Sequence, residues 1–289
     1  MGMSGLLPCD AGAHKLSTMM YLLLFPLGIA VGAFGTLIGA GGGFILMPIL
    51  LLAYPGADPA TLTAISLAVV FFNATSGTWS YARMKRVDFT SGLLFLLPGV
   101  PGSIAGAFLI HRVPRHAFNL AFGLFLLVGG AFIFIRSFFG NESKPWLKAT
   151  SHRTLIDAEG TRHVYAYNLA LGMTLSFAVG VASSMLGIGG GIIHVPAMVH
   201  LLDFPVHIAT ATSHFILMVM SLTATTMHIL DGALGWAELP LALTIAAGAV
   251  IGAQIGARLS KRIHGRWIMR SLAAALAMVG VRILIPALT

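Results

Sequence analysis

One glycine-rich stretch occurs twice in this chain and sets the main limit on what the chain can fold into. Residues 39–48 read GAGGGFILMP, and residues 187–196 read GIGGGIIHVP. In each copy, consecutive glycines stand between two apolar stretches, and a proline follows five residues after the last glycine. Glycine and proline interrupt helices, so one helix should end at each copy and another should begin. We therefore expect two broken helices at matching positions.

The composition indicates where these helices lie. Of the 289 residues, 57% are hydrophobic and only 9% are charged, whereas about 25% are charged in a typical soluble domain. Several apolar windows approach the roughly 20 residues that a helix needs to cross a bilayer, and no repeated alternating strands suggest a barrel. We predict an all-α, polytopic protein that lies in the lipid bilayer of the cell inner (plasma) membrane.

Several classes of function are unsupported by the sequence. The formal charge of +8 could suggest nucleic acid, but basic loops on a membrane protein are explained more simply as determinants of its topology. The single cysteine, Cys9, leaves no disulfide framework and no cysteine-built zinc site. Ser/His/Asp spacing, paired carboxylates and a phosphate-binding loop are all missing from the sequence. We expect no enzyme, no cofactor and no nucleic-acid partner.

The glycine stretches are part of a longer duplication. Gly39 and Gly187 are separated by 148 residues, as are Pro48 and Pro196, while Ser66 and Ser213 are separated by 147. Each repeat should contain five helical segments, and each broken pair either crosses the membrane twice or re-enters it as a hairpin. The expected organisation is an N-terminal tail (1–18), a first transmembrane repeat (19–136), a cytoplasmic linker (137–163) and a second transmembrane repeat (164–289).

An odd number of segments per repeat should invert the second repeat in the membrane, and the basic residues test this. Inversion places the loop 83–86, Arg136 with the linker that follows it, and the loop 258–270 on one face, where they gather thirteen of the 17 Lys and Arg residues. Parallel repeats give no such asymmetry. The positive-inside rule therefore favours inverted repeats whose termini both lie outside the cytoplasm.

These features resemble a known family. The pattern GxGGGxxxxP in both halves, each followed by an apolar helix with Ser and Thr, is similar to the TauE/SafE family of sulfite and organosulfonate transporters, also called toluene sulfonate uptake permeases. The resemblance extends over about residues 20–287. It implies a secondary transporter that moves sulfite, an organosulfonate or a related sulfur oxyanion by alternating access. Both exporters and importers occur in the family, so the direction of transport stays open.

The glycine breaks are the expected substrate site. The first N–H groups of a helix carry the positive end of its dipole, and a small anion is their natural ligand. The alternative is that the glycines only allow helices to pack closely. The expected substrate-binding residues come from the breaks and from the next helix of each half; they are Gly41, Gly42, Gly43, Phe44, Ser66, Asn73, Gly189, Gly190, Gly191, Ile192, Thr212 and Ser213.

Histidines are the expected proton carriers. No Lys, Arg, Asp or Glu lies near the centre of a span, so an intramembrane carboxylate or arginine clamp is missing. Histidine has the ordinary pKa nearest physiological pH, and His194 and His214 are the candidates for coupling, with a neutral structural histidine as the alternative reading. A sodium ion is the alternative coupling ion. His194, His214 and His228 have no evident carboxylate or thiolate partner, so we expect no metal site.

Two other classes remain open beside the carrier. One is an anion channel, and the other is a membrane module of a multi-protein complex. Flux that saturates and responds to an ion gradient favours the carrier, whereas a stoichiometric partner without flux favours the module. Assembly into a homo-oligomer is compatible with each of them.

Overall fold

The computed structural model describes residues 11–138 and 148–263, with scattered single positions from 267 to 281. The described first half consists of helices followed by a short 3-10 turn and one more helix: α1 (Ala11–Ile38), α2 (Gly43–Ala53), α3 (Pro59–Arg83), α4 (Phe89–Leu109), η1 (Ile110–Arg112) and α5 (Arg115–Phe138). The described second half contains α6 (Leu169–Leu186), α7 (Gly191–His200), α8 (Val206–Leu230) and α9 (Leu239–Ser260). The expected last segment, about 267–286, lies largely outside the described residues.

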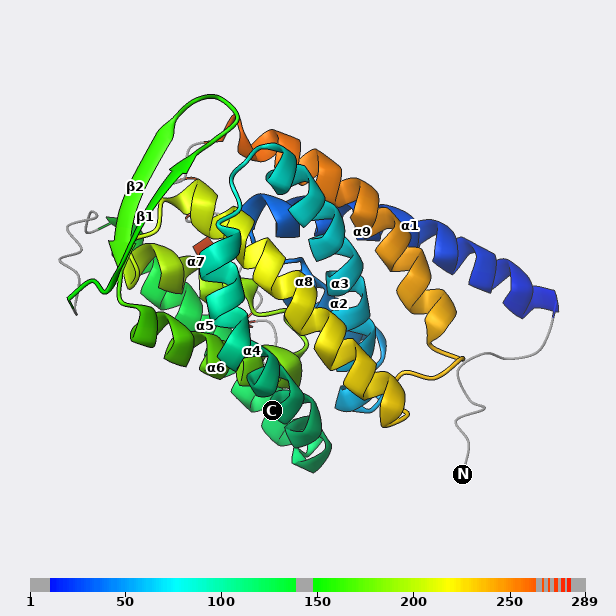
Figure 1. Cartoon of the computed structure of the whole chain (residues 1–289). Coiled ribbons are helices and arrows are strands. Elements are labelled where there is room, and N and C mark those ends of the chain that lie inside the picture. The colour runs from blue at the N-terminus through cyan, green and yellow to red at the C-terminus, as the bar shows by residue number, and fades with distance from the viewer. Residues whose placement is uncertain are drawn as a thin grey trace.

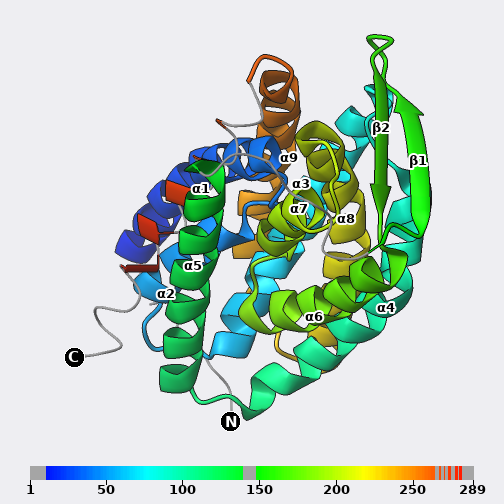
Figure 2. The same cartoon turned by 90° about the vertical axis from the view of Figure 1, so that its left-hand side faces the viewer.

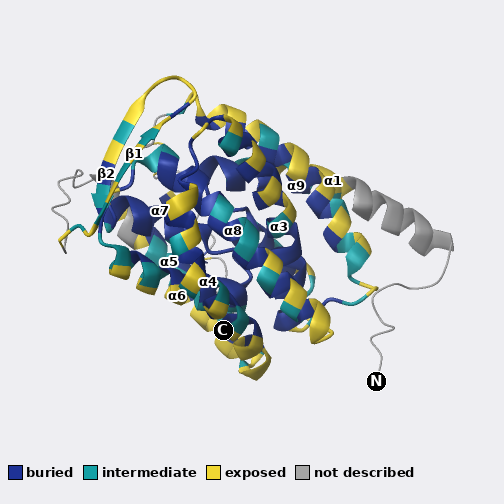
Figure 3. Ribbon diagram, viewed as in Figure 1, coloured by how far each residue is buried: buried dark blue, intermediate teal, exposed yellow. Residues whose placement is uncertain are grey.

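The fold is helical and suited to a membrane. In the described residues, α3, α6, α8, α9 and the unit formed by α4 and η1 are long and apolar enough to cross a bilayer. Helices α3 and α8 are the most buried of these spans and lie at the centre, while α4, α6 and α9 expose more of their length (Figure 3). Exposed leucines such as Leu93 and Leu97 on α4 are what a lipid-facing helix should carry.

Both glycine stretches interrupt the helices as the sequence predicted. Helix α1 ends at Ile38 and α2 begins at Gly43, and α6 ends at Leu186 before α7 begins at Gly191. Six glycines in these breaks have positive φ, from 68° to 90°. A residue with a side chain pays about 1–2 kcal/mol for that backbone conformation, so glycine is needed there. The glycines with positive φ are Gly39, Gly41, Gly42, Gly187, Gly189 and Gly190.

A β-hairpin between the halves was not anticipated. Strand β1 (Ser151–Ile156) pairs in antiparallel fashion with β2 (Arg162–Tyr167), so residues 164–167 are strand where the second membrane repeat was expected to begin. The sequence of β2 alternates, and this alternation turns Tyr165 and Tyr167 into the protein. Helix α6 then starts at Leu169, capped by Asn168, whose Oδ1 accepts from the N–H of Leu171. The N-terminal boundary also differs from the expectation, because α1 begins at Ala11.

Two helix pairs, α1 with α9 and α4 with α6, pack through glycines and account for much of the glycine content (Figure 1). Gly28 of α1 faces the backbone of Ile245, and Gly256 of α9 faces that of Ala33, so these two helices run in the same direction. A Cβ on Gly256 would lie 2.1 Å from the carbonyl oxygen of Ala33. Such backbone proximity is the usual way in which small residues join membrane helices.

The pair formed by α4 of the first half and α6 of the second repeats this arrangement (Figure 2). Gly172 faces Phe95 and Gly106 faces the backbone of Val181, so α4 and α6 also run in the same direction. Helix α9 is the counterpart of α4, and α6 is the counterpart of α1. Each half therefore packs its first helix against the fourth helix of the other half.

The bundle has two distinct ends. At the hairpin end, the N–H of Ala158 donates to the carbonyl of Met84, and Glu159 lies near both Arg86 and Lys261. The hairpin, the loop before α4 and the end of α9 therefore meet at this end. At the opposite end, Asp231 after α8 contacts His111 of η1.

The direction of each helix follows from these ends. Helix α4 begins at the hairpin end and α9 finishes there. Because α6 runs with α4 and α1 runs with α9, α6 leads away from the hairpin end and α1 leads towards it. The first helices of the two halves thus run in opposite directions through the bundle.

Candidate functional site

The two glycine breaks touch each other at the centre of the bundle. A Cβ on Gly43 would lie 2.8 Å from the carbonyl oxygen of Gly187. Reciprocally, a Cβ on Gly191 would lie 2.2 Å from the carbonyl oxygen of Gly39. The start of each short helix therefore rests on the unwound backbone of the other half. We call this contact the crossing, formed by residues 39–43 and 187–191.

A serine from each half holds the crossing together. Ser66 on α3 donates a hydrogen bond of 2.6 Å to the carbonyl oxygen of Gly187, and Ser213 on α8 donates one of 3.2 Å to that of Gly39. Both serines are fully buried. The breaks free carbonyl groups from helical bonding, and buried carbonyl groups need partners. Each half supplies the partner for the break in the other half.

The short helices begin with N–H groups that lack acceptors. In α2 the N–H groups of Ile45 and Leu46 both donate to the carbonyl of Gly42. Within the described residues, the N–H groups of Gly43 and Phe44, and that of Ile192 in α7, donate no hydrogen bond to a backbone carbonyl outside their own helix. The first N–H groups of any helix are left without intrahelical partners, and they carry the positive end of its dipole. The crossing thus contains donors suited to an anion.

The crossing is enclosed by protein. Gly41 and Gly189 both contact Val70 of α3 and Leu217 of α8, two residues at equivalent positions of the halves. All residues from 35 to 44 and from 186 to 192 are buried. Irregular backbone is tolerated at membrane depth only where protein or a polar cavity surrounds it, and this arrangement satisfies that condition.

Two threonines beside the crossing were not among the expected substrate-binding residues. Thr63 on α3 lies against Gly187, and Thr210 on α8 lies against Gly39. Both side chains are buried, and neither hydroxyl has a hydrogen-bond partner in the described part of the chain. The two threonines are 147 residues apart, the same offset as Ser66 and Ser213. Extending the register of the duplication by three residues would have found them.

Asn73 and His214 belong to one buried network. The hydroxyl of Thr36 donates to Oδ1 of Asn73 over 3.1 Å, and His214 Nε2 lies 3.2 Å from the same hydroxyl oxygen. With the hydroxyl proton of Thr36 directed at Asn73, Nε2 of His214 donates to Thr36 in the tautomer that carries its proton on Nε2. The ring of His214 also rests on Gly77 of α3. The network joins α1, α3 and α8, and its Thr36 was another residue that the sequence analysis missed.

His194 lies on α7, three residues after Gly191. Its side chain is 2% exposed, and both ring nitrogens lack a hydrogen-bond partner within the described residues. The equivalent residue of the first half is Leu46, which is also buried. A buried imidazole with two unpaired nitrogens costs free energy, so this position carries a polar group that packing alone does not require.

Two expectations from the sequence differ from the structure. Thr212 accepts a hydrogen bond from the N–H of Asp88 at the hairpin end, so the structure does not bring it to the crossing. The expectation that His228 has no carboxylate partner is wrong, because its Nδ1 lies 3.5 Å from Asp231 Oδ2. The contact of Thr212 depends on how α8 packs against the start of α4, which the sequence does not reveal. The contact of His228 joins residues three apart at the end of α8, a spacing that the sequence already contains.

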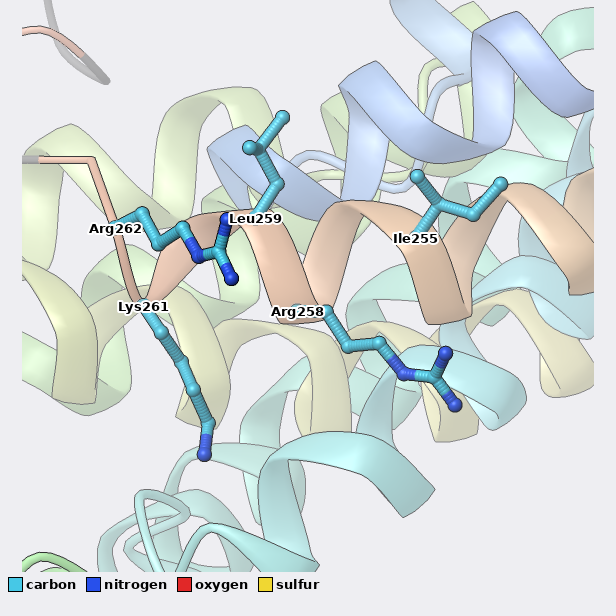
Figure 4. A pocket seen from close by; sticks show the side chains of 5 residues that line it. All are labelled: Ile255, Arg258, Leu259, Lys261 and Arg262. Carbon is cyan, nitrogen blue, oxygen red and sulfur yellow. The ribbon is translucent and has the colours of Figure 1, made fainter.

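The base of the hairpin forms a second polar cluster, at the start of α4. The Tyr165 hydroxyl donates to Asp88 Oδ2 over 2.7 Å, and Arg153 lies 3.7 Å from that oxygen. Burial and the neighbouring Asp88 carboxylate raise the pKa of Tyr165, so its hydroxyl stays protonated and acts as a donor. The cluster fixes the hairpin onto α4. A surface hollow at the same end of the bundle is lined by Ile255, Arg258 and Leu259 of α9 and by Lys261 and Arg262, which follow α9 (Figure 4).

A bundle of this kind, with several apolar spans and broken helices crossing at its centre, defines a multi-pass membrane protein of the transporter class. Comparison with known proteins makes the assignment specific. The family model described as sulfite exporter TauE/SafE matches residues 24–283, and the chain belongs to that family. Family membership and the names of its relatives indicate a membrane transporter and no enzyme.

Its relatives carry similar descriptions. The chain is 33% identical over 239 residues to the probable membrane transporter protein YunE of Bacillus subtilis, covering 80% of this chain and 85% of YunE. It is 27% identical over 242 residues to the probable membrane transporter protein MJ0441 of Methanocaldococcus jannaschii, covering 78% of this chain and 82% of that protein. No solved structure matches the chain.

Proposed function

We propose that this protein is a secondary transporter of a small anion, with sulfite, an organosulfonate or a related sulfur oxyanion as substrate. The observation that carries the proposal is the reciprocal contact of the two breaks, Gly43 with Gly187 and Gly191 with Gly39. It brings the starts of two short helices to one place, where unpaired N–H groups of both halves can act on one ligand. The sulfur oxyanion follows from the description of the family.

Neutral donors complete the proposed site. The hydroxyls of Ser66 and Ser213 already bond to break carbonyls, so they hold the backbone of the site in place. Thr63 and Thr210 have unpaired hydroxyls beside the same glycines and are better placed to donate to substrate oxygens. An anion held by backbone N–H groups and hydroxyls, without a fixed cation, can be released as well as bound.

We propose that transport proceeds by alternating access between two inverted repeats. The opposite directions of α1 and α6, and the exchange of first helices between the halves, support this arrangement. The crossing is fully enclosed, as an occluded state of such a carrier would be. Rocking one half against the other would expose the crossing first at one end of the bundle and then at the other.

We propose that the hairpin end faces the cytoplasm and that both termini lie outside it, in the inner membrane. The support is the gathering of basic segments at this end, where Arg86 and Lys261 both approach Glu159 of the hairpin. The positive-inside rule assigns such an end to the cytoplasm.

Coupling to a proton is proposed for His194 and His214. His214 connects to Asn73 through Thr36, and His194 has two free ring nitrogens among the described residues. Importing an anion against a negative interior costs about 2.3 kcal/mol per charge per 100 mV, and movement together with a proton avoids that cost. Sodium held by carbonyl groups of the breaks is the alternative.

The test is flux in liposomes that contain the purified protein. Uptake of sulfite, organosulfonates, sulfate and thiosulfate is measured with and without a proton gradient and with and without sodium. We expect saturable flux of a sulfur oxyanion that a gradient accelerates. Flux that does not saturate would point to a channel, and the lack of any flux together with a copurifying partner would point to a module of a complex.

Matched variants then test the site itself. Thr63→Val and Thr210→Val keep the side-chain shape and remove a hydroxyl that has no protein partner among the described residues. They should therefore keep or raise thermal stability and lower the flux. Thr75→Val is the control, because Thr75 is exposed and its hydroxyl donates to the carbonyl of Phe71 in its own helix. Normal flux in both site variants would remove these threonines from the proposed site.

A further inference from the structure

Far from the crossing, at the end of the bundle opposite the hairpin, two histidines and one aspartate converge. His111 Nε2 lies 2.8 Å from Asp231 Oδ2, and His228 Nδ1 lies 3.5 Å from the same oxygen. One potential ligand atom of each residue lies within 4.8 Å of the other two. We propose that His111, His228 and Asp231 form a binding site for a divalent transition-metal ion, with Zn²⁺ as its representative.

The spacing of the three atoms suits such an ion. Zinc binds imidazole nitrogen and carboxylate oxygen at about 2.0–2.2 Å, so neighbouring ligand atoms around it lie on the order of 3 Å apart. The two short separations, 2.8 and 3.5 Å, bracket that value. Two imidazoles and one carboxylate are also a donor set that late first-row ions prefer over Mg²⁺ or Ca²⁺. A half-open site leaves further coordination positions for water or a small ligand.

The burial of His228 distinguishes this cluster from a chance surface pair. Its side chain is fully buried, Nδ1 makes no hydrogen bond of good geometry within the described residues, and the backbone of Ser184 lies close to the ring. Asp231 is its nearest anionic neighbour. A buried imidazole normally has a partner, and a metal ion would satisfy Nδ1 directly. His111 is by contrast 36% exposed and provides the approach from solvent.

The surrounding backbone holds the carboxylate in position. Asp231 caps the C-terminus of α8, and its Oδ1 accepts a hydrogen bond of 3.0 Å from the N–H of Ala233. Oδ2 is therefore left to face the two imidazoles. Hydrogen bonds that orient a ligating carboxylate in this way are a regular part of metal sites.

The site would connect the two halves of the transporter. His111 belongs to the turn after α4 in the first half, and His228 and Asp231 belong to the end of α8 in the second half. An ion bound to all three would hold these helix ends together. This function is separate from substrate binding at the crossing, and binding of the metal can be measured without any transport assay.

The test uses tag-free, full-length protein in detergent, stripped with a chelator and then titrated with Zn²⁺ by calorimetry. Metal content after dialysis is measured by mass spectrometry, and Co²⁺ is used as a spectroscopic probe of coordination by nitrogen and oxygen. We expect one tightly held ion per chain. His111→Ala and Asp231→Asn should each weaken binding on the order of tenfold or more, since each removes one of three ligands.

Two histidine variants serve as controls. His116→Ala removes an exposed histidine five residues from His111, and His163→Ala removes a histidine paired with Asp157 at the hairpin. Both should bind Zn²⁺ like the unmodified protein. His111 is half-exposed, so His111→Ala should fold normally, and its melting temperature without metal provides the check. Unchanged affinity in His111→Ala, or no stoichiometric ion in the unmodified protein, would overturn the proposal.

Discussion

Ser66 on α3 donates a 2.6 Å hydrogen bond to the carbonyl oxygen of Gly187, which lies 121 residues further along the chain. Ser213 makes the matching bond to Gly39 in the other direction. Each half therefore stabilises the broken helix of the other half. Neither break has its full set of partners without the second half, so the two halves should be stable only together.

Removal of these hydroxyls gives the first prediction. Ser66→Ala leaves the buried carbonyl of Gly187 without its side-chain donor, and such a loss costs about 1–3 kcal/mol in the free energy of unfolding. Ser213→Ala should cost less, because its bond is longer at 3.2 Å. Thermal unfolding in detergent measures both, with Thr75→Ala as the control. A melting temperature of Ser66→Ala equal to that of the control would contradict the role assigned to Ser66.

The second prediction concerns the close approach of the two breaks. Gly191 and Gly129 both lie in helices, but a Cβ on Gly191 would meet the carbonyl of Gly39 at 2.2 Å, whereas one on Gly129 meets nothing within 4 Å. Gly191→Ala should therefore force the halves apart and lower both thermal stability and transport. Gly129→Ala should be neutral or stabilise by roughly 0.5–1 kcal/mol, because alanine favours helix. Equal melting temperatures of the two variants would mean that the crossing can accommodate an added methyl group, which would contradict the close packing of the two breaks.

The crossing could be anticipated because its signals are local and repeated. Gly39 and Gly187 lie 148 residues apart and begin the same pattern, GxGGGxxxxP, and consecutive glycines followed by a proline can hardly form a continuous helix. The register of the duplication also extends to Thr63 and Thr210. These two threonines each lie three residues before Ser66 and Ser213, so the same register leads to them.

Other features escaped because they depend on tertiary packing. Strand β2 follows polar residues and leads into an apolar helix, so its last four residues, 164–167, were interpreted as the start of a membrane span. His111 and Asp231 are 120 residues apart and come from turns without any shared motif. Thr212 lies next to Ser213, yet faces Asp88 instead of the crossing. Adjacent helix positions point in different directions, and only the packing of α8 decides which one faces the site.

The hairpin supplies a prediction on pH. Asp157 accepts hydrogen bonds of 2.9 Å from the N–H groups of Glu159 and Thr161, and His163 lies 3.1 Å from its other oxygen. Burial alone would raise the pKa of Asp157, but these three partners outweigh burial and lower the pKa below the ordinary value of 3.8.

The sign follows from that direction. A lowered pKa means that the folded hairpin prefers the charged carboxylate, so this stabilisation is complete well above pH 3.8 and is lost as the pH falls through the folded value. Hydrogen exchange of residues 151–167 between pH 3 and pH 7 should show protection that decreases at the acidic end. Asp157→Asn should be less protected at pH 7 and vary less with pH. A variant with the same pH profile as the unmodified protein would contradict this assignment.

Topology gives the fourth prediction. In a background without Cys9, Lys148→Cys places a thiol beside the hairpin, and Gly56→Cys places one in the loop between α2 and α3, where a Cβ meets nothing within 4 Å. A membrane-impermeant thiol reagent added to intact cells should label position 56 only. Position 148 should react only after the membrane is opened. Labelling of both positions from outside would contradict the proposed orientation of the hairpin end.

The last prediction separates stability from coupling at His194. This side chain is buried with two unpaired nitrogens among the described residues, and its counterpart in the first half is Leu46. His194→Leu therefore replaces a costly polar group by the residue that the other half uses. Relief of an unpaired buried group is worth about 1–3 kcal/mol, so the variant should melt at a higher temperature than the unmodified protein. His214→Leu should instead destabilise, because it removes the bond between His214 and Thr36.

Transport by His194→Leu should fall, although its thermal stability should rise. If His194 carries the coupled proton, the variant loses flux driven by a pH gradient but keeps some exchange of anion for anion, since exchange needs no net proton movement. Higher stability together with lost coupling would mean that His194 serves proton coupling and does not stabilise the fold. Full pH-driven flux in His194→Leu, in His214→Gln and in the two combined would instead make the histidines structural. Sodium held by the carbonyl groups of the breaks would then be the coupling ion to test.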